Sequence, residues 1–389
     1  MLGDNSTNAT VYRPYQMSVR DFKLSLMEYG EYVANKQILL YVPPILLVVG
    51  TFGNIFSFYI LLKSTKSATN ASTYSYLSVL ALMDLLVLYI GLLRLWIGQF
   101  MIDIEDTNIV LCKVVKFLGY VCSDASVWLI VAMTIERAIV VTFPLKATRI
   151  CNTKYSRMCI VGICVIFVFV NCHFLWSLEL THYTFNDTVI AECEATVSYK
   201  MLVEDIWPWV DAALYSLLPS LIIIVLNCII IKNVISAKNA RNVLRQESTL
   251  FRRNCLLSTQ SRNREQVSRK ITLMLLAISF TFLVTTLPMN IGLIYTSVLG
   301  VPDDNASLVK TQLVNTIAEM LMYTNHSINF FLYCATGKKF RSHFKTFICY
   351  CCIWRQSNSY SYSTRLVKIN ITKSDFLDCE QKYYRASTL

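Results

Sequence analysis

Ionisable side chains are rare within the long apolar stretches of this sequence, so each one found there is a candidate for chemistry. The whole chain is poor in charge, because 54% of its 389 residues are hydrophobic and only 16% are charged. A carboxylate that leaves water takes up a proton unless a cation or several hydrogen-bond donors surround it. The candidates are Asp84 and Asp124 in the middle of their stretches, Glu136 with the adjacent Arg137 at an inner end, and Glu319.

Uncharged polar side chains lie at comparable depth in the same stretches. With Asp84 they could form a small cage of oxygen atoms, which suits a sodium ion or a hydrogen-bonded network that rearranges between two states. No other metal and no cofactor is expected, because no His, Cys and Asp spacing typical of a metal site occurs. No phosphate-binding loop is present either, so an enzyme is not expected. The predicted network consists of Asn54, Asp84, Ser126, Asn325 and Asn329.

Seven long apolar segments must position these residues. A helix needs about 18 to 20 apolar residues to cross a bilayer core, and each segment reaches that length. Because a helix satisfies its own backbone hydrogen bonds in lipid, the sequence predicts an all-α membrane protein with seven spanning helices. Three segments carry no charge and four carry isolated charges; in chain order they are 38–62, 74–97, 109–141, 158–178, 210–231, 271–294 and 314–332.

Lys and Arg residues indicate which side of the membrane is cytoplasmic. With the N-terminus outside, the inner connections and the C-terminal tail hold most of the basic residues. The net charge of +11 therefore reflects topology, suits contact with anionic membrane lipid, and requires no nucleic acid. The prediction is a multi-pass plasma-membrane protein with an extracellular N-terminus; residues 1–37 are polar, so no cleavable signal peptide is expected. Glycosylation sequons that face outward under this topology begin at Asn5, Asn8, Asn186 and Asn305.

Cysteine positions fit the same topology. Of the 14 cysteines, only Cys112 and Cys193 lie on the oxidising side outside the helices, which predicts a disulfide between them. Cys349, Cys351 and Cys352 follow an amphipathic stretch and are predicted palmitoylation sites, with three unmodified thiols as the alternative.

Short motifs occur in a fixed order along the predicted spans. They are Gly53-Asn54, Leu80-x-x-x-Asp84, Glu136-Arg137, Pro144-Leu145, Pro219, Phe282 with Pro288, Asn329 to Tyr333, and Phe340-Arg341 with Phe344. In this order, and with Cys112 and Cys193, they resemble the rhodopsin-like (class A) G-protein-coupled receptors. The resemblance implies a seven-transmembrane helix bundle with a short amphipathic eighth helix, which activates a heterotrimeric G protein.

The predicted organisation follows the spans and this resemblance. An extracellular, glycosylated N-terminus (1–36) precedes the receptor domain (37–335) and the amphipathic helix (336–348). The remainder, 349–389, has no core-forming run and is expected to be a disordered cytoplasmic tail, phosphorylated by receptor kinases and bound by arrestin.

Five positions are implied to drive activation. Glu136 would hold Arg137 at rest, and the released Arg137 would face the cavity that receives the G protein; an interfacial ion pair is the alternative. Prolines kink helices, so Pro288 would let the sixth span swing its inner end, with Tyr333 turning inward beside Arg137. The implied activation residues are Glu136, Arg137, Phe282, Pro288 and Tyr333.

Some positions depart from the pattern of the family. Thr286 stands where a Trp is usual in the sixth span, Phe330 where a Pro is usual in the seventh, and Asn227 where a Tyr is usual in the fifth. These departures do not change the predicted fold. They alter positions that, in this family, transmit ligand binding to the G protein. A receptor-like protein that no longer signals is therefore an alternative.

The outer segments favour a peptide ligand. Gly119 stands where receptors for biogenic amines carry an Asp, and Tyr323 where opsins carry a retinal-binding Lys. Alternation on both sides of the pair at 186–187 predicts a β-hairpin, a lid typical of peptide receptors that leaves a wide vestibule open. Arg94 and Glu319 could either contact the ligand or pair with each other. Candidate ligand contacts are Arg94, Lys116, Tyr120, Asp211, Asn290, Glu319 and Tyr323.

One segment suggests a narrower class of ligand. Residues 329–341 resemble invertebrate neuropeptide receptors, including the FMRFamide group, whose peptides end in Arg and an amidated aromatic residue. Glu319 would suit that Arg. A receptor for a non-peptide ligand is the alternative within the family. A transporter is less favoured, because the chain has no internal repeat and an odd number of spans.

Overall fold

The computed structural model describes residues 26–65, 71–100, 103–185, 188–247, 258–300, 302, 304–336, 340–342 and 344. The chain divides into two units, Met1–Phe340 and Arg341–Leu389, and the first contains every helix and strand named below. The predicted tail and most of the predicted amphipathic helix lie outside the described residues. So do the predicted glycosylation sites Asn5, Asn8 and Asn186 and the predicted palmitoylation sites Cys349, Cys351 and Cys352.

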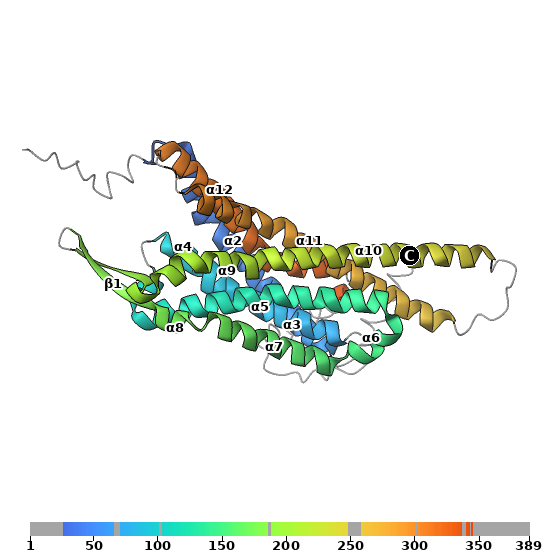
Figure 1. The fold of residues 1–389 in the computed structure, drawn as a ribbon. Helices are drawn as coiled ribbons and strands as arrows, with labels where there is room; N and C mark the ends of the chain where they lie inside the picture. Colours follow the sequence, from blue (N-terminus) through green and yellow to red (C-terminus); the bar gives the residue numbers. More distant parts are fainter. Residues whose placement is uncertain are drawn as a thin grey trace, which may run out of the picture. The chain divides into compact units, whose positions relative to one another are not determined.

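Long helical segments run side by side, and a two-stranded sheet lies at one end of them (Figure 1). In chain order the segments are α2 (Gly30–Thr65); α3 (Ala71–Val87), continued by the π-helical turn η1 (Leu88–Leu92) and α4 (Leu93–Gly98); α5 (Ile109–Thr142); α7 (Thr153–Asn171) with α8 (Phe174–Ser177); η4 (Met201–Ile206), α9 (Trp207–Asp211), the π-helical turn η5 (Ala212–Leu217) and α10 (Leu218–Glu247); α11 (Ser258–Leu299); and α12 (Asn305–Thr336). Short connecting elements are η2 (Glu105–Thr107), α6 (Pro144–Ile150) and η3 (Val197–Tyr199).

Six segments of the described chain are long and apolar enough to cross a membrane: Gly30–Thr65, Ala71–Gly98, Ile109–Thr142, Thr153–Ser177, Met201–Ala237 and Lys270–Thr296. The seventh predicted span is α12, whose 32 residues are long enough but less apolar. Its polar residues Thr316, Asn325, His326 and Asn329 are all buried. They lower the mean hydropathy of α12 without meeting lipid, because they face the interior of the bundle.

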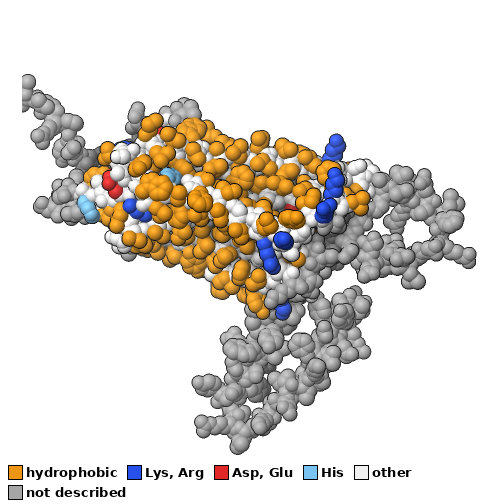
Figure 2. All heavy atoms as spheres, turned by 60° about the horizontal axis from the view of Figure 1, so that its bottom comes forward, with side chains coloured by type: hydrophobic (Ala, Val, Ile, Leu, Met, Phe, Trp, Pro, Cys, Tyr) orange, Lys and Arg blue, Asp and Glu red, His pale blue; other side chains and the backbone are white. Residues whose placement is uncertain are grey.

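The flank of the bundle is apolar. Figure 2 shows hydrophobic side chains over most of the visible flank, with Lys and Arg side chains gathered toward one end. Several helices carry strongly exposed large apolar side chains, among them Ile45 at 61%, Phe169 at 71% and Ile291 at 66%. Soluble proteins do not expose apolar surface on this scale, so the flank is the face that meets lipid.

Helix α5 is the central helix. In its apolar part 61% of the residues are buried, against 28% in the segment Thr153–Ser177. It packs against α3, α7 and α10, whereas α12 packs against α2 and α11. The interior between α5 and α12 is therefore where side chains of several spans meet.

Residues 178–195 form the predicted β-hairpin. Strands β1 (Leu178–Phe185) and β2 (Thr188–Ala195) pair in antiparallel register, from Leu178 with Ala195 to Phe185 with Thr188. The strands begin directly after α8, at the end of the fourth span. The prediction of a hairpin in this connection is confirmed.

Prolines lie in the fifth and sixth spans, and the proline of the fifth span follows an irregular turn. Pro219 is the second residue of α10 and follows the π-helical turn η5, while Pro288 lies inside α11. Proline has no N–H, so a carbonyl one turn earlier loses its helical partner, and wide turns accommodate such a loss. The turn η5 places Tyr215 and Ser216 in the interior, where both are buried.

Candidate functional site

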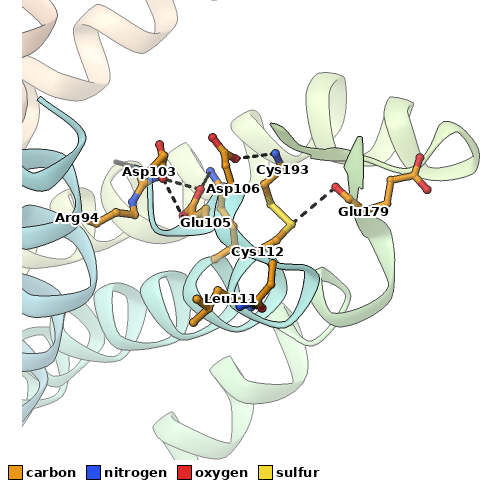
Figure 3. The surroundings of a disulfide bond; sticks show 10 residues. Arg94, Asp103, Glu105, Asp106, Leu111, Cys112, Glu179 and Cys193 are labelled. Atoms are coloured by element: carbon orange, nitrogen blue, oxygen red, sulfur yellow. Dashed lines mark hydrogen bonds and ion pairs between the residues drawn. A yellow bond between two sulfur atoms is a disulfide. The ribbon is translucent and has the colours of Figure 1, made fainter. Parts of the chain in front are cut away.

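The outer end of the bundle is fastened by a disulfide (Figure 3). Cys112 of α5 is bonded to Cys193 of β2, with 5.5 Å between their Cα atoms. The backbone N–H of Cys193 also donates to Asp106 Oδ1 at 2.8 Å, which ties β2 to the short turn η2. The predicted Cys112–Cys193 disulfide is confirmed, and it anchors the hairpin to the start of the central helix.

Glu105 of η2, which the sequence did not single out, organises the charges at this end. Its Oε2 lies 2.9 Å from Arg94 Nη1 and 3.1 Å from Lys116 Nζ. The Glu105 side chain is only 7% exposed. Arg94 also approaches Asp103 at 3.8 Å. Among the described residues Arg94 therefore forms its ion pairs with Glu105 and Asp103, and Glu319 interacts with Arg94 only at longer range.

A cavity of about 250 Å³ lies among η1, α5, η5, α11 and α12. Its lining combines apolar side chains with a few polar groups, as is typical of ligand sites. Glu319 does not belong to the lining. The other six predicted ligand contacts do, and their role in binding remains a prediction: Arg94, Lys116, Tyr120, Asp211, Asn290 and Tyr323.

Aromatic rings hold one of these lining residues in place. Tyr120 stacks on Phe174 with 4.7 Å between ring centroids, and it meets Trp207 edge-on at 6.0 Å. His173 packs on Phe174 at 4.2 Å and on Trp207 at 4.1 Å. Offset and edge-on ring pairs of this kind contribute packing energy beyond their buried area. Helices α8 and α9 thereby position a cavity residue of α5.

Asp211 differs from the other charged residues of the cavity. Arg94 and Lys116 both form an ion pair with Glu105, so each of these cations has an acidic partner. Asp211, the last residue of α9, lines the cavity but has no hydrogen bond or ion pair among the residues that the structure describes. A carboxylate in a partly buried position without such a partner favours the approach of a cation.

Two lining residues connect the cavity with groups deeper in the bundle. The Tyr215 hydroxyl lies 3.4 Å from His326 Nε2. Asn290 donates from Nδ2 to Ser216 Oγ at 2.5 Å and to the Thr286 carbonyl at 2.7 Å. A ligand that displaces either side chain would therefore disturb polar contacts beneath it.

The polar core is centred on Asp84, which is fully buried in α3. Its carboxylate accepts hydrogen bonds from Ser126 Oγ at 2.7 Å and from Asn329 Nδ2 at 2.7 Å. His326 Nδ1 lies 2.8 Å from Asp84 Oδ1. Asn54 joins the network by donating to the His326 carbonyl at 2.9 Å. Asp84 thus connects α3 with both α5 and α12.

The predicted network is assembled only in part. Asn54, Asp84, Ser126 and Asn329 are connected, but Asn325 is not: its buried Nδ2 has no hydrogen-bond partner within the described part of the chain. The imidazole of His326 makes the contact with Asp84 instead. The sequence signal for it was the spacing, because a residue three positions before Asn329 shares its helix face.

At the other end of α5, Glu136 and Arg137 are buried. Arg137 Nη2 lies 3.3 Å from Glu136 Oε1 and also donates to Thr73 Oγ1. Thr73 donates to Glu136 Oε1 at 3.2 Å, and Ser72 donates to Glu136 Oε2. A snorkelling interfacial arginine would keep its guanidinium in water, yet Arg137 is only 2% exposed. The pair ties α5 to α3, and its part in activation stays a prediction.

The remaining predicted activation residues lie in α11 and α12. Tyr333 is fully buried against the ring of Phe340 at 5.5 Å, and its hydroxyl has no hydrogen-bond partner in the described residues. Phe282 is also fully buried, and its carbonyl accepts a hydrogen bond from the Thr286 hydroxyl at 2.7 Å. Thr286 therefore turns back onto its own helix just before Pro288, an arrangement that bends helices.

Asn227, where the family usually has a Tyr, connects α10 with α11. Its Nδ2 donates to Ser279 Oγ at 2.9 Å, and Ser279 Oγ donates to Asn227 Oδ1 at 3.2 Å. A hydroxyl both donates and accepts, so the two hydrogen bonds can exist together. The fifth and sixth spans are thus joined by a reciprocal polar pair.

Comparison with known proteins places this arrangement in a family. Residues 53–333, most of the chain, match the family model described as 7 transmembrane receptor (rhodopsin family). The thyrotropin-releasing hormone receptor of Gallus gallus is 26% identical over 352 residues, which cover 85% of this chain and 83% of the relative. The growth hormone secretagogue receptor type 1 of Mus musculus is 26% identical over 304 residues, 76% of each chain.

The matched span contains the cavity, the polar core and the buried Glu136–Arg137 pair. The predictions of the seven-helix membrane fold and of a non-enzymatic protein are confirmed, because the matching family consists of receptors. The chain belongs to the rhodopsin family of seven-transmembrane receptors, the class A G-protein-coupled receptors, and is distantly related to receptors named for hormones.

Proposed function

We propose that this chain is a plasma-membrane receptor whose outer cavity binds an extracellular peptide and whose opposite end activates a heterotrimeric G protein. The observation that carries the proposal is the cavity, which combines charged anchors with an aromatic wall beside a disulfide-anchored hairpin. The two relatives above are named for hormone and secretagogue ligands, which favours a ligand of similar kind. Family membership favours coupling to a G protein.

Charge pairing indicates which part of a peptide the cavity would select. Arg94 and Lys116 share the carboxylate of Glu105, and Arg94 also approaches Asp103, so each cation already has an acidic partner. Asp211 has no such partner among the described residues, so a cationic group is the natural complement of the cavity. We therefore expect a peptide with an Arg or Lys side chain, or a free N-terminus, that reaches Asp211.

Glu319 remains the second candidate for this anchor. The sequence favoured it as the partner of an Arg in FMRFamide-like peptides. It has no hydrogen bond or ion pair among the described residues, but it lies outside the lining of the cavity. Asp211 is the better placed of the two carboxylates, and the narrower FMRFamide assignment stays a prediction.

The test is a screen of amidated neuropeptides on cells that express the receptor, read out as intracellular calcium and cyclic AMP. With an active Arg-containing peptide in hand, Asp211→Asn should raise its half-maximal concentration by about 10-fold or more, the loss of one charge-assisted hydrogen bond. Glu319→Gln should change it less. Asp205→Asn, which alters an exposed acid outside the cavity, is the matched control.

A peptide variant with citrulline in place of Arg completes a double-mutant cycle. If Arg meets Asp211, the citrulline peptide should lose as much potency on the wild type as the Arg peptide loses on Asp211→Asn. The two changes together should then cost little more than one of them. Equal potency on the wild type and on a normally expressed Asp211→Asn receptor would remove Asp211 from ligand binding.

Signalling is tested separately at the other end of the bundle. Arg137→Ala should abolish the peptide response while surface expression and peptide binding persist, because the resemblance assigns Arg137 to the G protein. A response unaffected by Arg137→Ala would refute coupling through this residue. Peptide binding without any response in the wild type would favour the receptor-like protein that does not signal, and a response to amines alone would favour a non-peptide ligand.

A further inference from the structure

Asp84 contacts three protein groups, and each of its carboxylate oxygens is reached by at least one of them. Ser126 and His326 both contact Oδ1, at 2.7 and 2.8 Å, and Asn329 donates to Oδ2 at 2.7 Å. Every one of these residues is less than 2% exposed. A buried carboxylate requires such partners, because an unsatisfied one is strongly destabilised. Here α5 and α12 supply all three.

The identity of the third donor argues against sodium at this site. Hard cations are bound by oxygen lone pairs. An ionised carboxylate has only acceptor oxygens, so facing an ionised Asp84 the Nδ1 atom of His326 carries the hydrogen and donates it to Oδ1. Neutral and protonated imidazole can both carry that proton. A ring nitrogen at 2.8 Å with its proton toward Oδ1 occupies the position where a cation would have to stand, so these residues do not fit sodium.

One further contact reaches the backbone of His326 and one reaches its ring. Asn54 of α2 donates to the His326 backbone carbonyl at 2.9 Å. Tyr215 of η5, a cavity residue, has its hydroxyl 3.4 Å from Nε2. The ring therefore bridges the floor of the cavity and Asp84, and it is fully buried.

We propose that His326 takes the place of a bound sodium ion in this receptor. Its imidazole holds Asp84 and thereby joins α3 to α12, and the bundle is stable without sodium. Removing the imidazole leaves the carboxylate with two donors, Ser126 and Asn329, and opens a space that sodium and water can enter.

The test needs no agonist, so it is independent of the proposed function. The full-length receptor is purified in lipid nanodiscs, and its melting temperature is measured in about 150 mM sodium chloride and in the same concentration of potassium chloride. For the wild type the two values should agree within about 1 °C, because a ligand that does not bind does not stabilise. For His326→Ser, sodium should raise the melting temperature by about 2 °C or more, saturating with concentration.

Three variants make the outcome specific. His182→Ser removes an exposed histidine of β1 and should behave like the wild type. Asp84→Asn added to His326→Ser should abolish the sodium effect, because the carboxylate is its ligand. His326→Asn, which keeps a polar side chain of smaller size, replaces His326→Ser if that variant does not fold.

Either of two results would overturn the proposal. A saturable stabilisation of the wild type by sodium, absent with potassium, would show that the ion binds beside His326. Folded His326→Ser and His326→Asn receptors that melt equally in both salts would show that the imidazole does not stand in for an ion.

Discussion

Replacing Glu105 by Gln would test whether one carboxylate holds the outer charge cluster together. Gln keeps the shape of the side chain but removes the charge that faces Arg94 at 2.9 Å and Lys116 at 3.1 Å. A hydrogen bond between charged groups contributes about 1.5 to 3 kcal/mol, and the lower value applies to cations that are 29% and 34% exposed. Two such bonds give a loss of about 3 kcal/mol in the free energy of unfolding.

The assay is the melting temperature of the purified receptor in detergent. A loss of this size should lower the melting temperature by roughly 5 °C or more. Asp103→Asn is the matched control, because Asp103 lies 3.8 Å from Arg94 and its side chain is 45% exposed, so its contribution should stay below about 1 kcal/mol. If Glu105→Gln melted at the wild-type temperature, the pairing of both cations with Glu105 would not stabilise the receptor, and the reasoning would be refuted.

Three further changes probe the helix contacts. Asn227→Ala removes both hydrogen bonds to Ser279, so α11 should separate from α10 more easily. Basal cyclic AMP or inositol phosphate signalling should then rise, and unchanged basal signalling would contradict this expectation. Thr73→Ala leaves Arg137 with Glu136 alone and should also raise basal signalling, whereas Thr73→Ser, which keeps the hydroxyl, should not. A Cβ at Gly50 would lie 2.3 Å from Leu88 Cδ1 and 3.3 Å from Ser327 Cα. Gly50→Ala should therefore reduce the free energy of unfolding by about 1 to 3 kcal/mol and lower the melting temperature. A wild-type melting temperature would show that α2 and α12 can move apart.

The features that the sequence predicted correctly are those with a local pattern. Apolar length identified the spans, and alternation on both sides of 186–187 identified the hairpin. The Cys112–Cys193 disulfide followed from topology, because no other pair lay outside the helices on that side. Even α12, the least apolar span, was found, since its buried polar residues belong to the motif that ends in Tyr333.

Pairings between distant elements were not predictable in the same way. Glu105 stands in a connection with no periodicity, and only the folded chain brings it between Arg94 of α4 and Lys116 of α5. Asp211 was one of seven candidate ligand contacts, and only the folded chain shows that the short helix α9 brings it to the cavity. His326 was one polar residue among several in the seventh span, and its contact with Asp84 depends on the rotation of α12 against α3.

The connection between the two ends of the bundle is polar where the family usually has an aromatic ring. The Thr286 hydroxyl donates to the Phe282 carbonyl of its own helix. Its small side chain therefore gives no large apolar surface beneath the cavity. The side chains that do reach from the cavity into the core are Tyr215, through His326 to Asp84, and Asn290, through Ser216 and the Thr286 carbonyl. Hydrogen bonds depend on distance and direction more steeply than ring packing does. We therefore expect a ligand that displaces Tyr215 to disturb its contact with His326 and so to affect Asp84 without a Trp in the sixth span.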